Sequence, residues 1–312
     1  MADLYMHSRL TEELIKVLPS DIDTDIAFLG SQGPDPLYYK SDTKYHDIAN
    51  DIHRHNTRSF FKTMTNYVKD NNSKTTYSFL VGFISHYAMD VFLHPYVYHH
   101  VGVYKKNDPS THYMRGLHLK YERAIDCLLI QKELNIPSRK LNLTKKYFPI
   151  KSAPKAVSDL IAYTLKKELK VADGFDLYTS SVKMMYLNFK YAVSDRFGLK
   201  KQFYKLVDLF SKDRDMFFSS LSLFNALEDY DYHNDSKSVW NHPLTNEVYT
   251  NTVEDLFREA KAFALHMITE VDKYINHNQA VNLDDVFTDL SFNSGTLCEL
   301  GMDFKYLNIY QK

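Results

Sequence analysis

The sequence predicts an all-α protein, and three observations favour this fold class. Apolar residues recur at helical spacing along most of the 312 residues. Glycine occurs only 9 times, so few residues suit tight turns, whereas 24 Tyr and 20 Phe residues supply core volume. The sequence contains no alternating run of convincing strand length and no internal repeat. We therefore expect a bundle of long helices.

The first half of the chain shows four helical patterns, over residues 3–18, 44–70, 75–94 and 114–134. In the first pattern, Leu10, Leu14 and Leu18 form an apolar stripe that His7 extends toward the N-terminus. Residues 20–42 are rich in glycine and proline and are expected to form turns. Because proline lacks the N–H that a helix needs, we expect Pro95 to end the third helix.

A proline-containing, basic stretch over residues 135–155 is expected to be a loop or linker. Beyond it, helical patterns recur over residues 155–170, 176–195, 199–212, 214–228 and 251–276. The last helix has a candidate cap at Asn251 with Glu254. These patterns predict a helical core over 1–135, a basic linker over 136–155 and a C-terminal helical region over 156–312. We expect that region to pack on the core as one domain.

Charge and cysteine content limit the expected partners and location. A net charge of −1 gives no reason to expect non-specific attraction to nucleic acid or membranes. Cys127 and Cys298 are expected to be packing residues, since two cysteines do not imply a disulfide framework. The first residues lack a secretory pattern, and the apolar stretch 79–93 is too short to span a membrane. The expected location is the cytoplasm.

Imidazole and carboxylate side chains in the first 122 residues form a candidate metal-binding set: His7, Asp35, His53, His86, Asp90, His94, His118 and Glu122. Zinc and similar divalent cations select these ligand types. His86, Asp90 and His94 follow one another at i,i+4 spacing, which places them on one helix face. Burying that row is expensive without a cation between its members.

Each part of this set also has a structural interpretation when it is considered alone. The alternatives are a solvated turn residue at Asp35, a hydrogen-bonded core histidine at His53, a His86–Asp90 ion pair, and an exposed His118–Glu122 pair. The occurrence of all eight residues over five segments favours the metal-binding interpretation.

Two further segments have two interpretations each. The polar and aromatic residues 229–243 either contact substrate or form a capping loop, and a capping loop is favoured. The basic stretch 139–155 either attracts an anionic substrate or is a solvated linker, and the linker is favoured.

In its candidate metal-binding residues and their spacing, the chain resembles the bacterial zinc-dependent phospholipase C family. The resemblance rests on Asp35 after proline, on His53, on the His86-x3-Asp90 helix with its following histidine, and on the His118-x3-Glu122 pair. Residues 29–36 (LGSQGPDP) and 86–96 (HYAMDVFLHPY) are especially similar to its intracellular, uncharacterised branch. The family shares its all-α fold with P1-type nucleases. The C-terminal half is similar only in being helical, which implies additional C-terminal helices.

The resemblance also implies a ligand set for two or three zinc ions. Asp35, His53, His86 and Asp90 would surround one ion, and His94, His118 and Glu122 a second. His7 would hold a third together with Asp90 and the amino-terminal residue. The secreted enzymes begin with a tryptophan that binds metal, whereas this chain begins Met-Ala and has its tryptophan at Trp240. Asp35 would also be the general base. The histidine after Asp90 follows at four residues, closer than in the secreted enzymes, so His99 or His100 is an alternative to His94.

The expected function is a zinc-dependent phosphoric ester hydrolase of the phospholipase C type, either a phosphodiesterase or a phosphomonoesterase. A metal-bridged hydroxide would attack phosphorus. The expected substrate is a small phosphate ester or a phospholipid, with no stable nucleic-acid partner. The alternatives are a metal-stabilised scaffold or binding protein without turnover, a P1-like nuclease or nucleotidase, and a phosphohydrolase that uses iron or manganese. The sequence predicts neither the natural substrate nor the oligomeric state.

Overall fold

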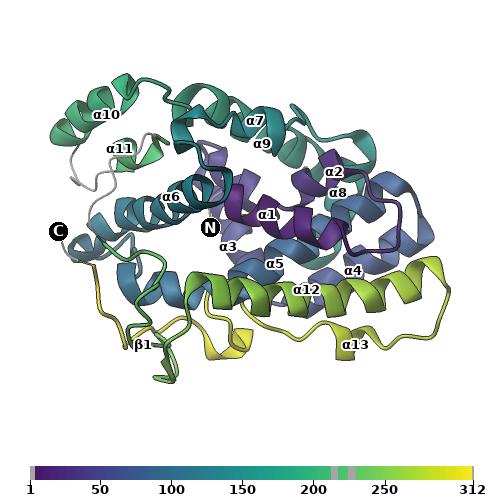
Figure 1. The fold of residues 1–312 in the computed structure, drawn as a ribbon. Helices are drawn as coiled ribbons and strands as arrows, with labels where there is room; N and C mark the ends of the chain where they lie inside the picture. Colours follow the sequence, from purple (N-terminus) through teal and green to yellow (C-terminus); the bar gives the residue numbers. More distant parts are fainter. Residues whose placement is uncertain (1–3, 212–216, 224–229, 311–312) are drawn as a thin grey trace.

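The protein is described by a computed structural model that covers residues 4–211, 217–223 and 230–310. Within these ranges it is a helical bundle with one small antiparallel pairing of two short strands (Figure 1). The all-α prediction is therefore confirmed. The sheet is a two-residue pairing at the edge of the bundle, in which Trp240 faces Tyr249.

The N-terminal half contains the helices that surround the candidate site: α1 (Leu4–Ile15), α2 (Thr24–Gly30), α3 (Thr43–Arg54), α4 (Thr57–Asp70), α5 (Lys74–Val101) and α6 (Tyr113–Leu134). Short 3-10 turns connect them: η1 (Asp35–Tyr39), η2 (Pro109–Thr111) and η3 (Ser138–Lys140).

The remaining elements cover the bundle and one of its ends: α7 (Leu143–Lys146), α8 (Lys155–Leu169), α9 (Gly174–Asn188), the π-helical turn η4 (Phe189–Val193), α10 (Leu199–Phe210), α11 (Phe217–Leu221), β1 (Trp240–Asn241), β2 (Val248–Tyr249), α12 (Val253–Asn276), α13 (Leu283–Val286) and η5 (Cys298–Leu300).

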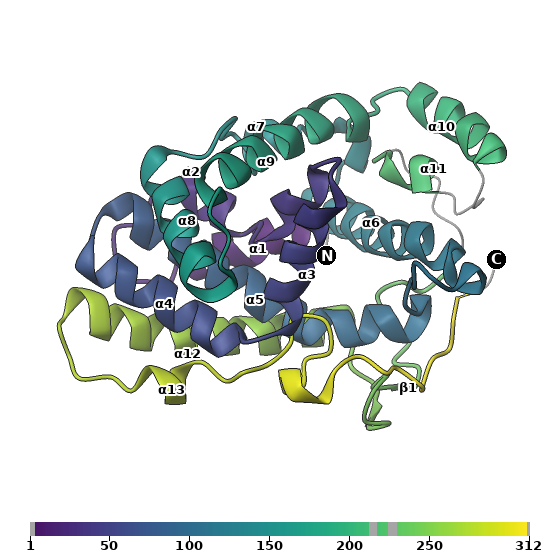
Figure 2. The same cartoon turned by 180° about the vertical axis from the view of Figure 1, so that it is seen from behind.

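Helix α5 is the central element of the bundle, with α1, α2 and α12 packed around it (Figures 1 and 2). Its residues are buried on nearly every side, as expected for a helix whose apolar residues surround the whole axis. Helix α2 approaches it closely because Gly82 has no side chain. A Cβ at Gly82 would lie 2.0 Å from the carbonyl oxygen of Ala27.

Two predicted helix boundaries in the first half are wrong. Pro95 lies inside α5, which continues to Val101. The missing hydrogen bond costs about 3 kcal/mol, and the complete burial of Tyr96 and Val97 offsets it. The predicted helix 44–70 is two helices, because the chain turns at Asn56, whose φ is +51°. The turn-rich segment 20–42 also contains a helix, α2, that the sequence did not predict.

In the C-terminal half, α12 packs against α5 and joins the same hydrophobic core. Its cap is Thr252 with Asp255, one residue later than predicted, in a reciprocal capping box. The predicted helix 214–228 lies mostly outside the described residues, and α11 is its described part. The division of the chain near residues 135 and 155 stays a prediction.

Among the described helices, none combines the length and the apolar character required to cross a bilayer.

Candidate metal centre

The eight predicted ligand residues converge in the interior of the bundle from five elements. Helix α1 provides His7, η1 provides Asp35, α3 provides His53, α5 provides His86, Asp90 and His94, and α6 provides His118 and Glu122. They form three adjoining groups, and within each group the candidate ligand atoms lie within 4.8 Å of one another. The groups are His7/His86/Asp90, Asp35/His53/His86 and His94/His118/Glu122.

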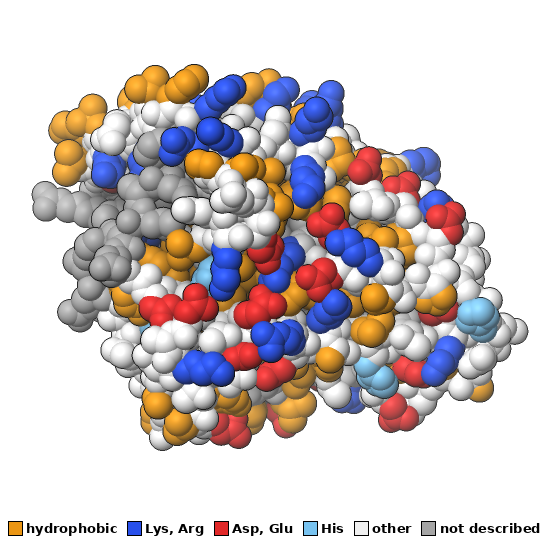
Figure 3. Space-filling view, in the orientation of Figure 1, with side chains coloured by type: hydrophobic (Ala, Val, Ile, Leu, Met, Phe, Trp, Pro, Cys, Tyr) orange, Lys and Arg blue, Asp and Glu red, His pale blue; other side chains and the backbone are white. Residues whose placement is uncertain are grey.

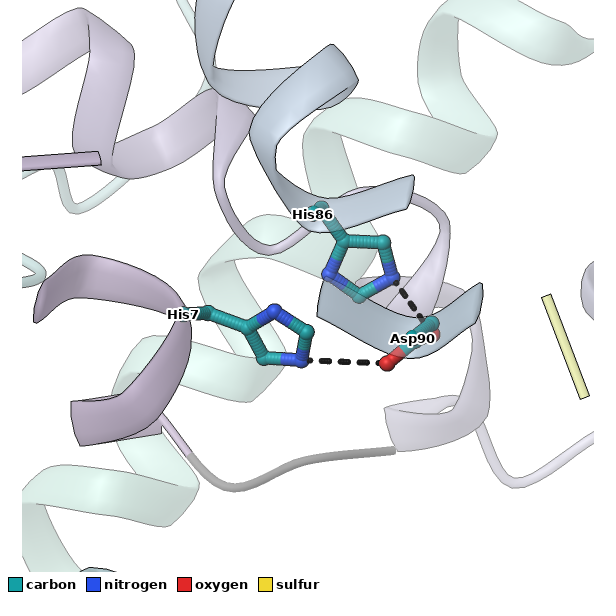
Figure 4. A group of neighbouring side chains, drawn as sticks. All are labelled: His7, His86 and Asp90. Carbon is teal, nitrogen blue, oxygen red and sulfur yellow. Dashed lines mark ion pairs between the residues drawn. The ribbon is translucent and has the colours of Figure 1, made fainter. Parts of the chain in front are cut away.

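The carboxylate of Asp90 lies at the centre of this arrangement. Its Oδ2 is 3.2 Å from Nε2 of His86 and 3.7 Å from Nε2 of His53. Its Oδ1 is 3.4 Å from Nε2 of His7 and 3.6 Å from Nε2 of His94. Figure 4 shows the His7 and His86 rings directed toward Asp90 from different elements. The two oxygens therefore face different sets of imidazoles, as a carboxylate that bridges two cations would.

The other two carboxylates complete the groups on either side of Asp90. Oδ1 of Asp35 lies 3.3 Å from Nε2 of His53. Oε1 of Glu122 lies 3.4 Å from Nε2 of His94 and 3.0 Å from Nε2 of His118. The His118 side chain is 20% exposed, whereas that of Glu122 is 2% exposed. This third group is therefore the most open to solvent.

Several of the converging atoms are buried without a hydrogen-bond partner among the described residues. They are Nδ1 and Nε2 of His7, Oδ1 of Asp35, Nε2 of His53, Nε2 of His86, and both carboxylate oxygens of Asp90. Unpaired buried polar atoms are rare because each loses its hydration without compensation. A cation bonded to these atoms would remove that cost. The donor set, imidazole nitrogens with carboxylate oxygens, fits zinc.

Backbone carbonyls orient three of the imidazoles. Nδ1 of His53 lies 2.7 Å from the oxygen of Ala49, and Nδ1 of His86 lies 3.0 Å from the oxygen of Ser31. Nδ1 of His94 lies 2.9 Å from the oxygen of Phe292. Because a carbonyl oxygen can only accept, each Nδ1 carries the proton and donates it. Nε2 is then left with the lone pair that a metal ligand needs.

The electrostatics of the centre favour a charged carboxylate at Asp90 and neutral imidazoles at His7 and His53. At His86, burial opposes the charge, but Asp90 and Asp35 outweigh it and raise the pKa. Burial lowers the pKa of His7 to about 3 and also lowers the pKa of His53. Burial opposes the charge on Asp90, but the neighbouring His94 and His86 outweigh it and hold the pKa of Asp90 well below its usual range. These two protonation states are the ones required for binding a cation.

Gly33 makes room for the His86 ring in the loop between α2 and η1. Its φ is +50°, in the region that favours glycine, and a Cβ would lie 2.2 Å from Cδ2 of His86. The loop then continues through Pro34 to Asp35, so Gly33 helps to set the positions of two candidate ligands.

Replacing Gly33 by Ala is expected to lower the free energy of unfolding by about 2–4 kcal/mol, through backbone strain and the clash with His86. The zinc content should fall with it. The matched control is Gly301→Ala: Gly301 has a φ of +66°, but nothing lies within 4 Å of the added Cβ. Thermal melts of both variants measure the loss of stability, and metal analysis measures the zinc content. If both variants lost the same stability and kept the same zinc content, the role of Gly33 in making room for His86 would be contradicted.

Asp126 on α6 fixes the start of α1. Its Oδ2 accepts a hydrogen bond of 2.7 Å from the backbone N–H of Tyr5, and its Oδ1 accepts one of 3.0 Å from Met6. The carboxylate is fully buried and satisfies N–H groups in the first turn of the helix that carries His7. Asp126 is therefore a positioning residue for the His7 group.

Replacing Asp126 by Ala should lower the free energy of unfolding by about 2–4 kcal/mol, because two hydrogen bonds to a charged acceptor are lost. We expect the His7 group to lose its metal first, so that the zinc count falls by no more than one. Chemical denaturation and metal analysis measure the two effects. Asp126→Asn keeps one acceptor and should show a smaller loss. Unchanged stability in Asp126→Ala would contradict this account.

The segment 287–297 supports the centre in a way that sequence reasoning missed. The ring of Phe292 lies 5.0 Å from the ring of His53 and 5.9 Å from that of His86. Its N–H donates a 2.9 Å hydrogen bond to the carbonyl oxygen of His53, and its own carbonyl oxygen accepts a hydrogen bond from Nδ1–H of His94. Backbone contacts leave no pattern in a sequence, and nothing distinguished this Phe from the other 19.

Among the described residues, the other candidates considered in the sequence analysis are in none of the three ligand groups. His99 and His100 are in none of the three groups, and Nδ1 of His99 is hydrogen-bonded to the carbonyl oxygen of Tyr306. Within the described part of segment 229–243, Trp240 and His242 hydrogen-bond to backbone carbonyls, as in a capping loop. Asp229 and the amino-terminal residue lie outside the described residues. Cys127 and Cys298 are buried and form no disulfide.

The fold and these three groups define a helical protein with a candidate multinuclear metal centre. The family model described as zinc dependent phospholipase C matches residues 6–175, which is more than half of the chain and includes all eight predicted ligands. The chain belongs to this family. Membership supports a zinc-dependent, phospholipase C-like hydrolase and zinc as its metal. No curated protein and no solved structure matches the chain.

Proposed function

We propose that the protein is a zinc-dependent phosphodiesterase of the phospholipase C type that cleaves a phospholipid or a smaller phosphate diester. The observation that carries this proposal is the position of Asp90, whose two buried, unpartnered oxygens face separate sets of imidazoles. A purely structural zinc site needs four closed ligands and no shared carboxylate. Adjoining sites are typical of enzymes that transfer or hydrolyse phosphoryl groups.

The proposal assigns each ligand to one of two or three ions. Asp35, His53, His86 and Oδ2 of Asp90 would hold one ion. His94, His118 and Glu122 would hold the second, and His7 with Oδ1 of Asp90 would contribute to a third. Bound zinc would supply an activated water and neutralise the phosphate oxygens.

In the proposed reaction Asp35 also accepts the proton of the attacking water. It lies in a loop between two prolines, which restrict the backbone on both sides, and its side chain is nearly buried. A carboxylate held in this way moves little when the proton is transferred.

Three polar side chains border the centre and are suited to meet an anionic substrate. Arg54 follows His53 in α3, and its buried Nε has no hydrogen-bond partner among the described residues. The hydroxyl of Tyr38 lies 3.5 Å from Nδ1 of His53, and the ring of Tyr98 lies 5.0 Å from that of His118. Both tyrosine residues are half-buried, and the hydroxyl of Tyr38 donates a hydrogen bond of 2.9 Å to Oδ1 of Asn50.

The test is hydrolysis of phosphatidylcholine and of bis(p-nitrophenyl) phosphate by the full chain loaded with zinc, and separately with iron or manganese. Asp35→Asn is expected to lower kcat by about 10²–10⁴-fold while circular dichroism stays unchanged. At least one zinc should remain, since the His94 group is intact. Asp303→Asn, at an exposed carboxylate, is the matched control.

Two outcomes would overturn the proposed function. Full turnover by Asp35→Asn would remove its role in proton transfer. Zinc-loaded protein that hydrolyses neither diester would favour a metal-stabilised scaffold, and hydrolysis restricted to single-stranded nucleic acid would favour a P1-like nuclease.

A further inference from the structure

Helix α10 presents its apolar face to solvent. Leu199, Phe203, Leu206 and Phe210 follow one another at spacings of four, three and four residues, which places them on one face. Their exposed fractions are 73%, 61%, 52% and 83%. In a surface helix of a globular protein such a stripe normally packs against the core. In α10 the buried residue is instead a polar one, Asp208.

The exposed apolar face extends beyond α10 itself. Phe197, in the turn before the helix, is 77% exposed, Tyr191 is 60% exposed and Leu209 is 71% exposed. We define the α10 surface as Tyr191, Phe197, Leu199, Phe203, Leu206, Leu209 and Phe210. In Figure 3, apolar side chains gather at the edge of the molecule where α10 lies, with basic side chains beside them. Clustered apolar exposure of this kind marks an interaction surface.

The exposed and half-buried charged side chains of residues 190–210 have one sign. Between residues 190 and 210, all of which the structure describes, every charged side chain that is not buried is basic: Lys190, Arg196, Lys200, Lys201 and Lys205. The two acidic residues in this range, Asp195 and Asp208, are buried. The whole chain carries a net charge of −1, so this concentration of positive charge is local.

Both buried carboxylates are engaged in backbone hydrogen bonds. Asp195 accepts from the N–H groups of Lys200 and Lys201 at the start of α10. Asp208 accepts from the N–H groups of Phe218 and Ser219 in α11, at 3.0 and 2.8 Å. Asp208 therefore joins α10 to α11, and Asp195 satisfies N–H groups in the first turn of α10, so both carboxylates are turned away from solvent.

The α10 surface is connected to the helix that carries the most open part of the centre. Helix α10 packs on α11, and α11 packs on α6. The guanidinium of Arg115 on α6 lies 4.1 Å from the centre of the Phe217 ring of α11. His118, the most exposed candidate ligand, follows Arg115 by three residues on the same helix.

We propose that the α10 surface docks on an anionic lipid bilayer. The apolar side chains enter the boundary between headgroups and acyl chains, and the lysines and arginine lie against the phosphate groups. Complementary charge is what selects this occupant. A second copy of the chain would bring two basic rims together, and like charges repel. The inference goes beyond the proposed hydrolysis, because docking needs neither metal nor turnover.

The test is co-sedimentation of the full chain with vesicles of phosphatidylcholine alone and of phosphatidylcholine with about 30 mol% phosphatidylserine. We expect binding to the anionic vesicles and at least about tenfold weaker binding to the neutral ones. The variant Phe203→Ser/Leu206→Ser/Phe210→Ser should bind the anionic vesicles at least about tenfold more weakly. The matched control is Val239→Ser/Val248→Ser/Leu300→Ser, at apolar side chains that are exposed elsewhere.

A charge variant and a metal-free sample complete the experiment. Lys201→Glu/Lys205→Glu should weaken binding to the anionic vesicles and remove the preference for them. Protein stripped of metal should bind like the holoprotein, which separates a failure of docking from a failure of hydrolysis. Equal vesicle binding by the triple α10 variant, or none by the wild type, overturns the inference. It is also overturned if the wild type is a dimer that this variant converts to a monomer without any binding to vesicles.

Discussion

Replacing Asp90 by Asn is expected to remove zinc from the centre and to lower phosphodiester hydrolysis by at least about a thousandfold, since bound metal supplies several kcal/mol of transition-state stabilisation. The substitution keeps the shape of the side chain and removes its negative charge. Each of the two oxygens faces a different set of imidazoles. Asn keeps only one oxygen and carries no charge, so one side of the centre loses its ligand atom and the other keeps a weaker, neutral one. Metal analysis and steady-state kinetics on bis(p-nitrophenyl) phosphate measure the two effects.

Asp272→Asn is the matched control for this variant. Asp272 is also a buried carboxylate, but it accepts hydrogen bonds from Ser20, Tyr77 and Asn276 between α12 and its neighbours, away from the centre. Its loss should lower the melting temperature and leave the ratio of zinc to protein unchanged. Full zinc content in Asp90→Asn would contradict the position that we assign to Asp90.

Removing the metal with a chelator is expected to lower the melting temperature by about 10 °C or more. Each ion bound at 100 to 1,000 times its Kd stabilises the fold by about 3–4 kcal/mol. In a chain of 312 residues, each kcal/mol shifts the melting temperature by about 1.5 °C, so two ions account for about 10 °C. The apoprotein also keeps the buried, unpartnered atoms of His7, His53, His86 and Asp90. Differential scanning calorimetry before and after chelation measures the shift.

Adding zinc back should restore the melting temperature, whereas magnesium should not, because it prefers oxygen ligands and near-octahedral geometry. Asp90→Asn provides a second comparison, since its melting temperature should respond less to the chelator than that of the wild type. An unchanged melting temperature after verified loss of metal would show that the centre contributes nothing to stability.

The fold class and the members of the site could be predicted because both depend on local patterns. Helical periodicity predicted most of the helices, and i,i+4 spacing placed His86, Asp90 and His94 on one face. The residue types indicated a metal, since imidazoles and carboxylates on an apolar face need a partner. Resemblance to a family supplied the grouping, which the structure brings together in space. Their role as ligands stays a proposal.

The remaining features depend on tertiary contacts. Burial of the residues after Pro95 overrides its tendency to end a helix, and a left-handed Asn56 divides one apolar pattern into two helices. Asp126 has the spacing of an ordinary helical residue, and only the fold shows that it holds the start of α1. The carbonyl of Phe292 has no sequence pattern at all.

The distribution of charge in space could not be predicted either, because the net charge is a sum over the whole chain. The value of −1 gave no reason to expect attraction to a membrane. Within residues 190–210, the two acidic side chains are buried and the basic side chains are not. The proposed docking surface depends on that separation.

The most direct test of the central claim is a crystal structure of protein purified without chelator, with anomalous scattering measured on both sides of the zinc absorption edge. The account predicts one peak among Asp35, His53, His86 and Asp90, and a second among His94, His118 and Glu122. A third peak between His7 and Asp90 is compatible with the proposed set of two or three ions. The absence of zinc peaks at the first two positions, in protein that never met a chelator, would contradict it.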